Sequence, residues 1–254
     1  MRLKVLILGG TSEGRRLTEQ LVSDARYETL LSFAGRTSSL VRPPSAHRVG
    51  GFGGASGLAA FLREGGFEAL IDATHPFAAQ ISTNAVRASE LTGIPLLRVT
   101  RPAWRPEPGD QWREVSDMEA AVAALGEAPR RVFSTIGRLE VAAFGRAPQH
   151  DYLLRAIDAF DPGLPRARVI CARGPFDRDG EQRLLERERI ELLVTKNAGT
   201  SATYAKIEAA RALAIPVIMV ARPPVPHARE RDSVAGAVAW LAVLHGSARS
   251  ERGE

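Results

Sequence analysis

Residues 3–14 read Leu-Lys-Val-Leu-Ile-Leu-Gly-Gly-Thr-Ser-Glu-Gly, and this stretch decides the fold. The apolar run predicts a buried parallel strand, and Leu17 and Leu21, four residues apart, predict a helix after the turn. A glycine-rich turn between a first strand and a first helix binds a dinucleotide pyrophosphate, because small residues admit the phosphates and the helix N-terminus presents unpaired N–H groups. The predicted cofactor-binding residues of the turn are Gly9, Gly10, Thr11, Ser12, Glu13 and Gly14.

The spacing of this motif leaves an alternative open. It is G-G-x-x-x-G, whereas the common dinucleotide fingerprint is G-x-G-x-x-G. A tight strand-to-helix turn without a ligand would also use glycines in this way. The rest of the chain must decide between the two interpretations.

Composition indicates a water-soluble protein with an anionic small-molecule partner. The chain has 254 residues, 44% apolar and 25% charged, and a net charge of +5. Of its 34 basic residues only Lys4, Lys196 and Lys206 are lysines, and the arginines are scattered, without a basic run. This pattern argues against nucleic acid as the partner.

The cysteine count and the N-terminus exclude further classes. Cys171 is the single cysteine, which rules out an intramolecular disulfide and a cysteine metal cluster, and we expect it to be a buried core residue. No metal site is expected. The N-terminal apolar run is too short for a signal peptide or a membrane span, so the expectation is a cytoplasmic protein without a membrane contact.

Strand-like and helix-like segments alternate almost throughout, which is typical of an α/β fold with parallel sheets. We predict two similar Rossmann-like domains with mostly parallel sheets and the active site in the cleft between them. The first covers residues 1–102 and binds the cofactor; the second covers 103–254 and faces the substrate. A proline-rich segment at 101–112, around Trp104, is the predicted linker. The predicted strands are 3–8, 28–33, 47–49, 69–72, 96–99, 131–135, 152–155, 168–172, 192–195 and 217–220.

The loop after the second strand indicates which cofactor binds. An NAD site has an acidic residue near this point for the ribose 2′-hydroxyl, whereas this chain has Arg36 and Thr37. An arginine there accommodates a 2′-phosphate, so the sequence favours NADP(H). The alternative is a solvated loop arginine.

Thr74 and His75 follow the fourth strand, at the sheet edge where open α/β sheets bind ligands. Pro76 predicts the start of the next helix, with Thr74 or His75 near its cap. We assign Thr74 and His75 to the nicotinamide side of the cofactor. A purely structural role for His75 is the alternative.

The chain also shows signs of an internal duplication. Residues 71–102 match residues 192–223 without a gap at an offset of 121, and 4–13 match 131–140 more weakly at an offset of 127. The first offset places Thr74 over Thr195 and His75 over Lys196. The alternative is that two βαβ units look alike because both obey the same packing rules.

Residues 196–201, Lys-Asn-Ala-Gly-Thr-Ser, combine side-chain and backbone donors at a helix start and favour a carboxylate or phosphate. Simple helix capping is the alternative for Thr200 and Ser201.

Three stretches together resemble the precorrin-6A reductase family, which includes the cobalt-precorrin-6A reductases. They are residues 8–14 (LGGTSEG), 72–78 (DATHPFA), and 195–197 (TKN) continuing through 204–210 (YAKIEAA). The resemblance spans nearly the whole chain. It implies an NADPH-dependent reduction of one double bond in the corrin-precursor macrocycle of cobalamin biosynthesis. It also implies an acidic tetrapyrrole, precorrin-6A, as the substrate, with handover to neighbouring pathway enzymes as a further expectation.

On this interpretation the second domain faces the substrate, together with the two Arg-Pro pairs Arg101-Pro102 and Arg222-Pro223. The candidate catalytic residues are Lys196 and His75. The candidate substrate-binding residues are Lys196, Asn197, Thr200, Ser201, Tyr204, Arg101 and Arg222.

Two rival functions remain open. Another NADP-dependent oxidoreductase of an acidic small molecule, such as a short-chain dehydrogenase, would need Tyr-x-x-x-Lys, but Tyr204 and Lys206 are two residues apart. A non-catalytic NADP(H)-sensing module would bind the nucleotide without turnover.

Overall fold

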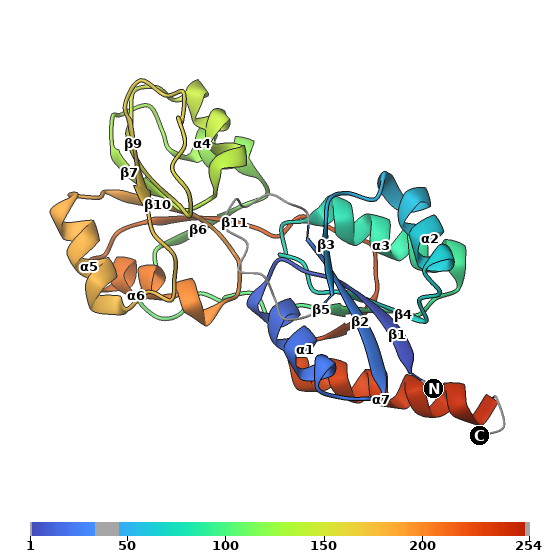
Figure 1. Ribbon diagram of the computed structural model, residues 1–254. Helices are drawn as coiled ribbons and strands as arrows, with labels where there is room; N and C mark the ends of the chain where they lie inside the picture. The colour runs from blue at the N-terminus through green and yellow to red at the C-terminus, as the bar shows by residue number, and fades with distance from the viewer. Residues whose placement is uncertain (1, 34–45, 252–254) are drawn as a thin grey trace. The chain divides into compact units, whose positions relative to one another are not determined.

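The computed structural model describes residues 2–33 and 46–251. The chain forms two compact units (Figure 1). The first comprises Met1–Pro102 together with Pro224–Glu254, and the second comprises Ala103–Pro223. That the active site lies between them stays a prediction.

The first unit is built on a six-stranded parallel sheet with the strand order β12-β5-β4-β1-β2-β3. β1 lies at its centre, and five of its six residues are buried, because a parallel strand is covered on both faces. The strands are β1 (Leu3–Leu8), β2 (Tyr27–Phe33), β3 (His47–Val49), β4 (Ala69–Asp72), β5 (Leu96–Val99) and β12 (Arg229–Arg231).

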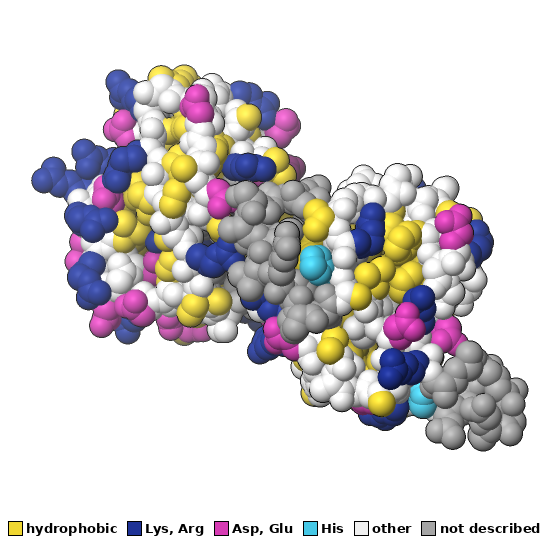
Figure 2. Space-filling view, viewed as in Figure 1, with side chains coloured by type: hydrophobic (Ala, Val, Ile, Leu, Met, Phe, Trp, Pro, Cys, Tyr) yellow, Lys and Arg dark blue, Asp and Glu magenta, His cyan; other side chains and the backbone are white. Residues whose placement is uncertain are grey.

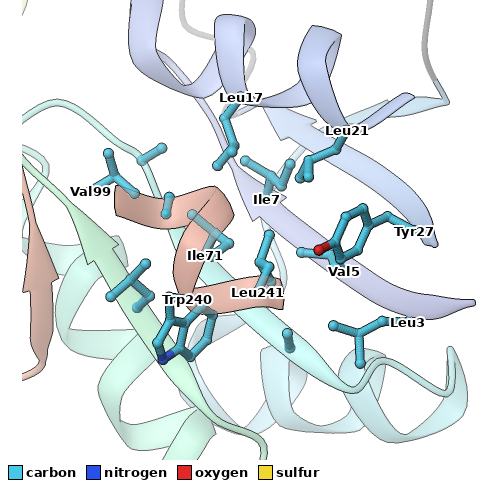
Figure 3. Close-up of a cluster of buried hydrophobic side chains, with 14 of the residues drawn as sticks. Leu3, Val5, Ile7, Leu17, Leu21, Tyr27, Ile71, Val99, Trp240 and Leu241 are labelled. Carbon is cyan, nitrogen blue, oxygen red and sulfur yellow. The ribbon is translucent and has the colours of Figure 1, made fainter. Parts of the chain in front are cut away.

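Helices cover both faces of this sheet (Figure 1). α1 (Ser12–Val22) and α7 (Val234–Glu251) share one hydrophobic cluster with the sheet, and α2 (Gly54–Glu64) and α3 (Ala79–Thr92) share another. Figure 3 shows Trp240 and Leu241 of α7 among side chains of β1, β4 and α1. Side chains of β1 alternate between the two clusters, with Val5 and Ile7 in one and Leu6 and Leu8 in the other. A parallel sheet with helices on both faces is a doubly wound domain.

The second unit repeats the plan, with sheet order β6-β11-β10-β7-β8-β9 and parallel pairing. Its strands are β6 (Trp112–Val115), β7 (Arg131–Ser134), β8 (Asp151–Ala156), β9 (Ala167–Cys171), β10 (Leu192–Lys196) and β11 (Val217–Val220). Its helical segments are α4 (Met118–Ala124), α5 (Arg178–Arg187), α6 (Ala205–Ala212) and the 3₁₀ segments η1 (Arg138–Arg146) and η2 (Ser201–Thr203).

The two Rossmann-like domains of the sequence prediction are therefore confirmed. The assignment of all of 103–254 to the second domain is wrong for the C-terminal strand and helix. β12 pairs with β5, and Ala237, Trp240 and Leu241 complete the core of the first unit. β12 and β6 themselves were not predicted as strands.

The gap-free duplication match is also wrong by two residues. β5 and β11 correspond at the offset of 121, since Leu96 and Val217 are their first residues. Leu96 pairs with Leu70, and Val217 pairs with Leu193, so β4 and β10 correspond at an offset of 123. The reason is a shorter connection in the second unit, where η2 and the 8-residue α6 replace the 14-residue α3.

The corrected register changes the correspondence of the candidate residues. Thr74 corresponds to Asn197, and Lys196 falls opposite Ala73 rather than His75. Lys196 and His75 therefore do not occupy equivalent positions in the two units.

Two smaller expectations fail for local reasons. α3 begins at Ala79 instead of Pro76, because residues 73–78 form a turn whose hydrogen bonds are described below. Cys171 is exposed, because it ends β9 at the edge of the sheet.

Among the helices of the described ranges, none has the length and apolarity that crossing a membrane requires. The same residues contain no group of three or more His, Cys, Asp or Glu side chains that could hold a metal ion.

Candidate functional site

The turn after β1 is held by the side chain of Thr11. Thr11 is the N-cap of α1: its Oγ1 accepts a hydrogen bond from the Gly14 N–H at 3.2 Å. The same hydroxyl donates to the Ala73 carbonyl at 2.8 Å. This second bond joins the turn after β1 to the turn after the neighbouring strand β4. The two predicted parts of the cofactor site are thus brought together.

The three glycines of the turn serve different purposes. A Cβ on Gly9 would come within 2.6 Å of Leu31 Cδ1, and one on Gly14 would meet Ala73 at 3.3 Å. Gly10 has φ +135°, a conformation that L-residues rarely adopt, and no atom lies within 4 Å of its Cβ position. Gly9 and Gly14 therefore permit close packing, and Gly10 leaves open space at the start of the helix.

Glu13 places a carboxylate in the first turn of α1, and basic side chains surround it. It is 8% exposed, accepts from Ser12 Oγ at 3.0 Å, and lies 3.6 Å from Arg101 and 3.4 Å from Arg16. Burial lowers the pKa of the Arg101 guanidinium, and the Glu13 carboxylate opposes that change. Arg101, which we assigned to the substrate, is thus beside the cofactor turn.

The turn lies where an open sheet binds ligands. β2 and β3 extend from one side of β1, and β4 and β5 extend from the other, so the strand order reverses at β1. Ligands bind in the crevice at the carboxyl ends of the strands at such a point. Arg36 and Thr37, the residues predicted to select NADP(H), lie outside the described residues.

The turn after β4 is organised by a buried carboxylate that sequence reasoning did not single out. Asp72 is 1% exposed, and its Oδ1 accepts from the Thr74 N–H at 3.1 Å and from Thr74 Oγ1 at 2.6 Å. His75 follows, and its Nδ1 accepts from the Phe77 N–H at 3.2 Å. Both predicted residues thus have fixed positions in this turn.

In the second unit, Lys196 ends β10, and its Nζ forms an ion pair with Glu140 Oε1. Glu140 lies in η1, which follows the neighbouring strand β7. The pair is partly buried, with 13% of the Lys196 side chain exposed. Lys196 therefore presents an ammonium group at the carboxyl edge of the sheet, with a carboxylate as its present partner.

Asn197 is 4% exposed, and its amide is engaged by the backbone of Trp104. Its backbone carbonyl accepts from Arg222 Nε at 3.0 Å. The structure thus brings Lys196, Asn197 and Arg222 together around the ends of β10 and β11.

Of the remaining candidates of this unit, Thr200 and Tyr204 have side-chain partners of their own. Thr200 is the N-cap of η2 and accepts from the Ala202 N–H at 3.3 Å, and Ser201 is exposed. The Tyr204 hydroxyl donates to Glu107 Oε1 at 3.1 Å and accepts from Arg211 Nη2 at 2.8 Å. Burial raises the pKa of this phenol.

A buried ion pair at the end of β8 was missed. Arg155 donates to both oxygens of Glu181, at 3.0 and 2.7 Å, and lies 4.1 Å from the centre of the Phe176 ring. The Lys206 ammonium group interacts electrostatically with the Glu181 carboxylate. Burial lowers the pKa of Lys206 to about 7, and the Glu181 carboxylate opposes this change. Its Nζ donates to the Thr203 carbonyl at 2.8 Å. The sequence marked Lys206 only as one of three lysines and as part of the stretch 204–210.

Two exposed apolar side chains also lie at this edge. Leu139, 63% exposed, is beside Glu140 in η1, and Ile157, 44% exposed, directly follows β8. Because β10, β7 and β8 are neighbours, Lys196, Leu139 and Ile157 follow adjacent strands. Together they offer a cation and apolar surface, which suits an apolar ring with carboxylate substituents.

Charged side chains of both signs are mixed on the face of the described residues that Figure 2 shows, with Lys and Arg interspersed among Asp and Glu. A gathering of basic side chains marks the end of the second unit that carries α5, which contains Arg178, Arg183 and Arg187.

Comparisons with known proteins agree along nearly the whole chain. Residues 4–242 match the model of the family described as "Precorrin-6x reductase CbiJ/CobK". A precorrin-6A reductase of Sinorhizobium sp is 48% identical over 245 residues, covering 94% of each chain. One of Rhodobacter capsulatus is 46% identical over 241 residues, covering 94% of this chain and 96% of the relative. A solved structure, "CobK precorrin-6A reductase", has a TM-score of 0.90 at 46% identity, covering 95% of this chain and 97% of its own.

Proposed function

The chain belongs to the precorrin-6x reductase family, and from this premise we propose that NADPH is its reductant and precorrin-6A its substrate. It is an oxidoreductase that reduces a carbon–carbon double bond of the corrin-precursor macrocycle in cobalamin biosynthesis. The structural observation that carries the cofactor proposal is the glycine-rich turn at the point where the strand order reverses.

The residues of this turn fit a pyrophosphate. Gly10 leaves its Cβ position open, and the start of α1 presents backbone N–H groups and the positive end of the helix dipole. The carboxylate of Glu13 would oppose an anion, but Arg101 and Arg16 offset its charge. We assign Gly9 to Gly14 to the pyrophosphate and Arg36 with Thr37 to the 2′-phosphate.

When bound, the nicotinamide supplies a hydride, and the chain must orient it, exclude water and provide charge where the macrocycle needs it. Thr74 and His75 occupy the β4 side of the turn, which we assign to the nicotinamide half. Lys196 at the carboxyl edge of the second sheet pairs with a substrate carboxylate or assists protonation. Leu139 and Ile157 contact the apolar ring.

We also propose a cytoplasmic location and handover of the product to neighbouring pathway enzymes. Both NADPH and a tetrapyrrole with many carboxylates are water-soluble anions, which supports this setting.

A short-chain dehydrogenase mechanism has no support in the side chains. Tyr204 is bonded to Glu107 and Arg211, and the Lys206 ammonium group is directed to the Thr203 carbonyl. The lysine that a short-chain dehydrogenase needs four residues after its tyrosine is absent, because Glu208 stands at that position.

The proposal is tested by following NADPH absorbance with and without precorrin-6A, with NADH in parallel. We expect oxidation only when both NADPH and precorrin-6A are present. Arg36→Ala should weaken NADPH binding by about 1–3 kcal/mol, the range for a charge-assisted hydrogen bond, and leave NADH binding unchanged. Arg26→Ala, which removes an exposed partner of Asp24, is the control. Equal losses for both cofactors would refute the 2′-phosphate assignment, and binding without oxidation would favour a sensing module.

A further inference from the structure

Three charged residues form a row across neighbouring strands of the first sheet. Asp72 of β4 is the register partner of Arg98 of β5, and Arg98 is the register partner of Glu230 of β12. Register partners in a parallel sheet project to the same face. The row therefore alternates negative, positive and negative charge, and it starts at the last residue of β4.

The middle of this row is buried. Arg98 is 7% exposed and Asp72 1% exposed, with Arg98 Nε 3.5 Å from Asp72 Oδ2. The other guanidinium nitrogens donate to Glu230 Oε1 at 3.0 Å and to the Pro226 carbonyl at 3.1 Å. A buried carboxylate needs such partners, because an unpaired charge in the interior is strongly destabilising. Arg98 thus fixes the orientation of Asp72 and connects it to the C-terminal segment.

The other carboxylate oxygen of Asp72, Oδ1, holds the turn that follows β4. Oδ1 accepts from both the N–H and the Oγ1 of Thr74. A carboxylate that accepts from the backbone two residues onward closes an Asx-type turn. The Thr74 hydroxyl also lies 3.4 Å from Ser82 Oγ of α3. The row therefore determines where the chain goes after β4.

His75 is the residue that this turn presents. Because Nδ1 accepts from the Phe77 N–H, the neutral imidazole carries its proton on Nε2. In this tautomer Nε2 is a hydrogen-bond donor. The Thr11–Ala73 bond ties the same turn to the glycine-rich turn.

We propose that Asp72 is a positioning residue, held by Arg98 and Glu230, which through Thr74 places His75 as an Nε2–H donor at the nicotinamide end of the cofactor. This rests on the proposed function. A dinucleotide whose pyrophosphate lies at the end of β1, with its adenosine ribose toward β2, has its nicotinamide toward β4.

The experiment compares Thr74→Val, which removes the hydroxyl donor to Asp72, with Thr74→Ser, which keeps it. Measurements are kcat with precorrin-6A, NADPH affinity, and affinity for 2′-phospho-ADP-ribose, which lacks the nicotinamide. Thr74→Val should lower kcat by about 10- to 100-fold, the cost of a misplaced reacting group, and Thr74→Ser should recover most of this loss. Affinity for 2′-phospho-ADP-ribose should stay within about twofold in both variants.

A double-mutant cycle separates positioning from general stability. If Thr74 acts through His75, the double variant Thr74→Val/His75→Ala should be no slower than His75→Ala alone, because coupled residues are not additive. Asp72→Asn, close in shape, is measured in the same cycle and gives the answer should Thr74→Val not fold.

Wild-type kcat in folded Thr74→Val or Asp72→Asn, or additive losses with His75→Ala, would overturn the positioning role. A wild-type enzyme that fails to oxidise NADPH with precorrin-6A would instead overturn the proposed function, so the two failures are distinguishable.

Discussion

Both ends of the Asn197 side-chain amide bond the backbone of Trp104: Oδ1 accepts from its N–H at 2.7 Å, and Nδ2 donates to its carbonyl at 2.9 Å. The two residues are 93 positions apart in the chain. Asn197 therefore fastens the segment that enters the second unit onto the end of β10. Its side-chain oxygen and nitrogen are each engaged by this contact.

Asn197→Ala should destabilise the protein by about 2–4 kcal/mol, because the backbone N–H and carbonyl of Trp104 lose their partners. Ser201→Ala, at an exposed neighbouring position, should stay within about 0.5 kcal/mol. Urea unfolding at a fixed pH measures both. A normal free energy of unfolding for Asn197→Ala, with a raised KM for precorrin-6A, would return this residue to the substrate site.

Lys196→Ala should raise the KM for precorrin-6A, lower kcat, or both, and leave NADPH affinity within about twofold. Glu140→Gln should have the opposite effect on substrate binding, because it removes the carboxylate that is paired with the Lys196 ammonium group. Its KM should be equal to or below that of the wild type. Steady-state kinetics and NADPH titration measure these effects, with Lys4→Ala of the partly exposed Lys4–Glu28 pair as the control. Unchanged kinetics in Lys196→Ala would remove this strand end from the substrate site.

Gly10→Ala and Gly66→Ala test whether the turn binds nucleotide or only turns the chain. Both glycines have positive φ and an open Cβ position, so each alanine should cost about 1–3 kcal/mol of backbone strain. Only Gly10→Ala should also lose NADPH affinity, since its methyl group enters the space assigned to the pyrophosphate. Calorimetric titration and thermal unfolding give the two quantities. Equal NADPH affinity in the two variants would mean that the turn is structural.

Lys206 should make stability increase with pH above neutrality. Burial lowers its pKa in the folded state to about 7 from an ordinary 10.5, so between these values the unfolded chain binds a proton that the folded chain does not. The free energy of unfolding should rise by about 1.4 kcal/mol per pH unit, so that the gain between pH 7 and 9 is about 2–3 kcal/mol.

Lys206→Met should lack this rise. Urea unfolding at pH 7, 8 and 9 makes the comparison, and parallel curves for the two proteins would contradict it. Above about pH 10 the stability should fall again, because burial raises the pKa of Tyr152 and the unfolded phenol ionises first.

The sequence was informative where strands are buried on both faces. β1, β4, β5 and β11 are mostly apolar, and their bounds were predicted to the residue, as were those of the short exposed edge strand β3. β12 is Arg-Glu-Arg, all exposed, and β6 is Trp-Arg-Glu-Val with two exposed charged residues. Edge strands of this kind are stabilised by a partner strand and carry no apolar pattern, so the sequence offered no signal for them.

The site was predictable only in part for a similar reason. The Gly10 turn and the Thr74–His75 turn follow apolar strands directly, so topology alone placed them at one edge. The role of Asp72 depends on Arg98, 26 residues away in the chain, and the role of Asn197 depends on Trp104, 93 residues away. No sequence pattern relates residues at such separations. Polar contacts of this type are a property of the folded chain.

The return of the C-terminal segment to the first unit has a consequence for how the protein is synthesised. On the ribosome, residues 1–102 emerge before the second unit, but the strand that covers the β5 edge and the helix that supplies Trp240 and Leu241 emerge only after it. The second unit, whose residues are continuous from Ala103 to Pro223, has all its strands earlier. The nascent chain can therefore complete its second domain before its first, and the cofactor turn acquires its finished support only after the second domain has been synthesised.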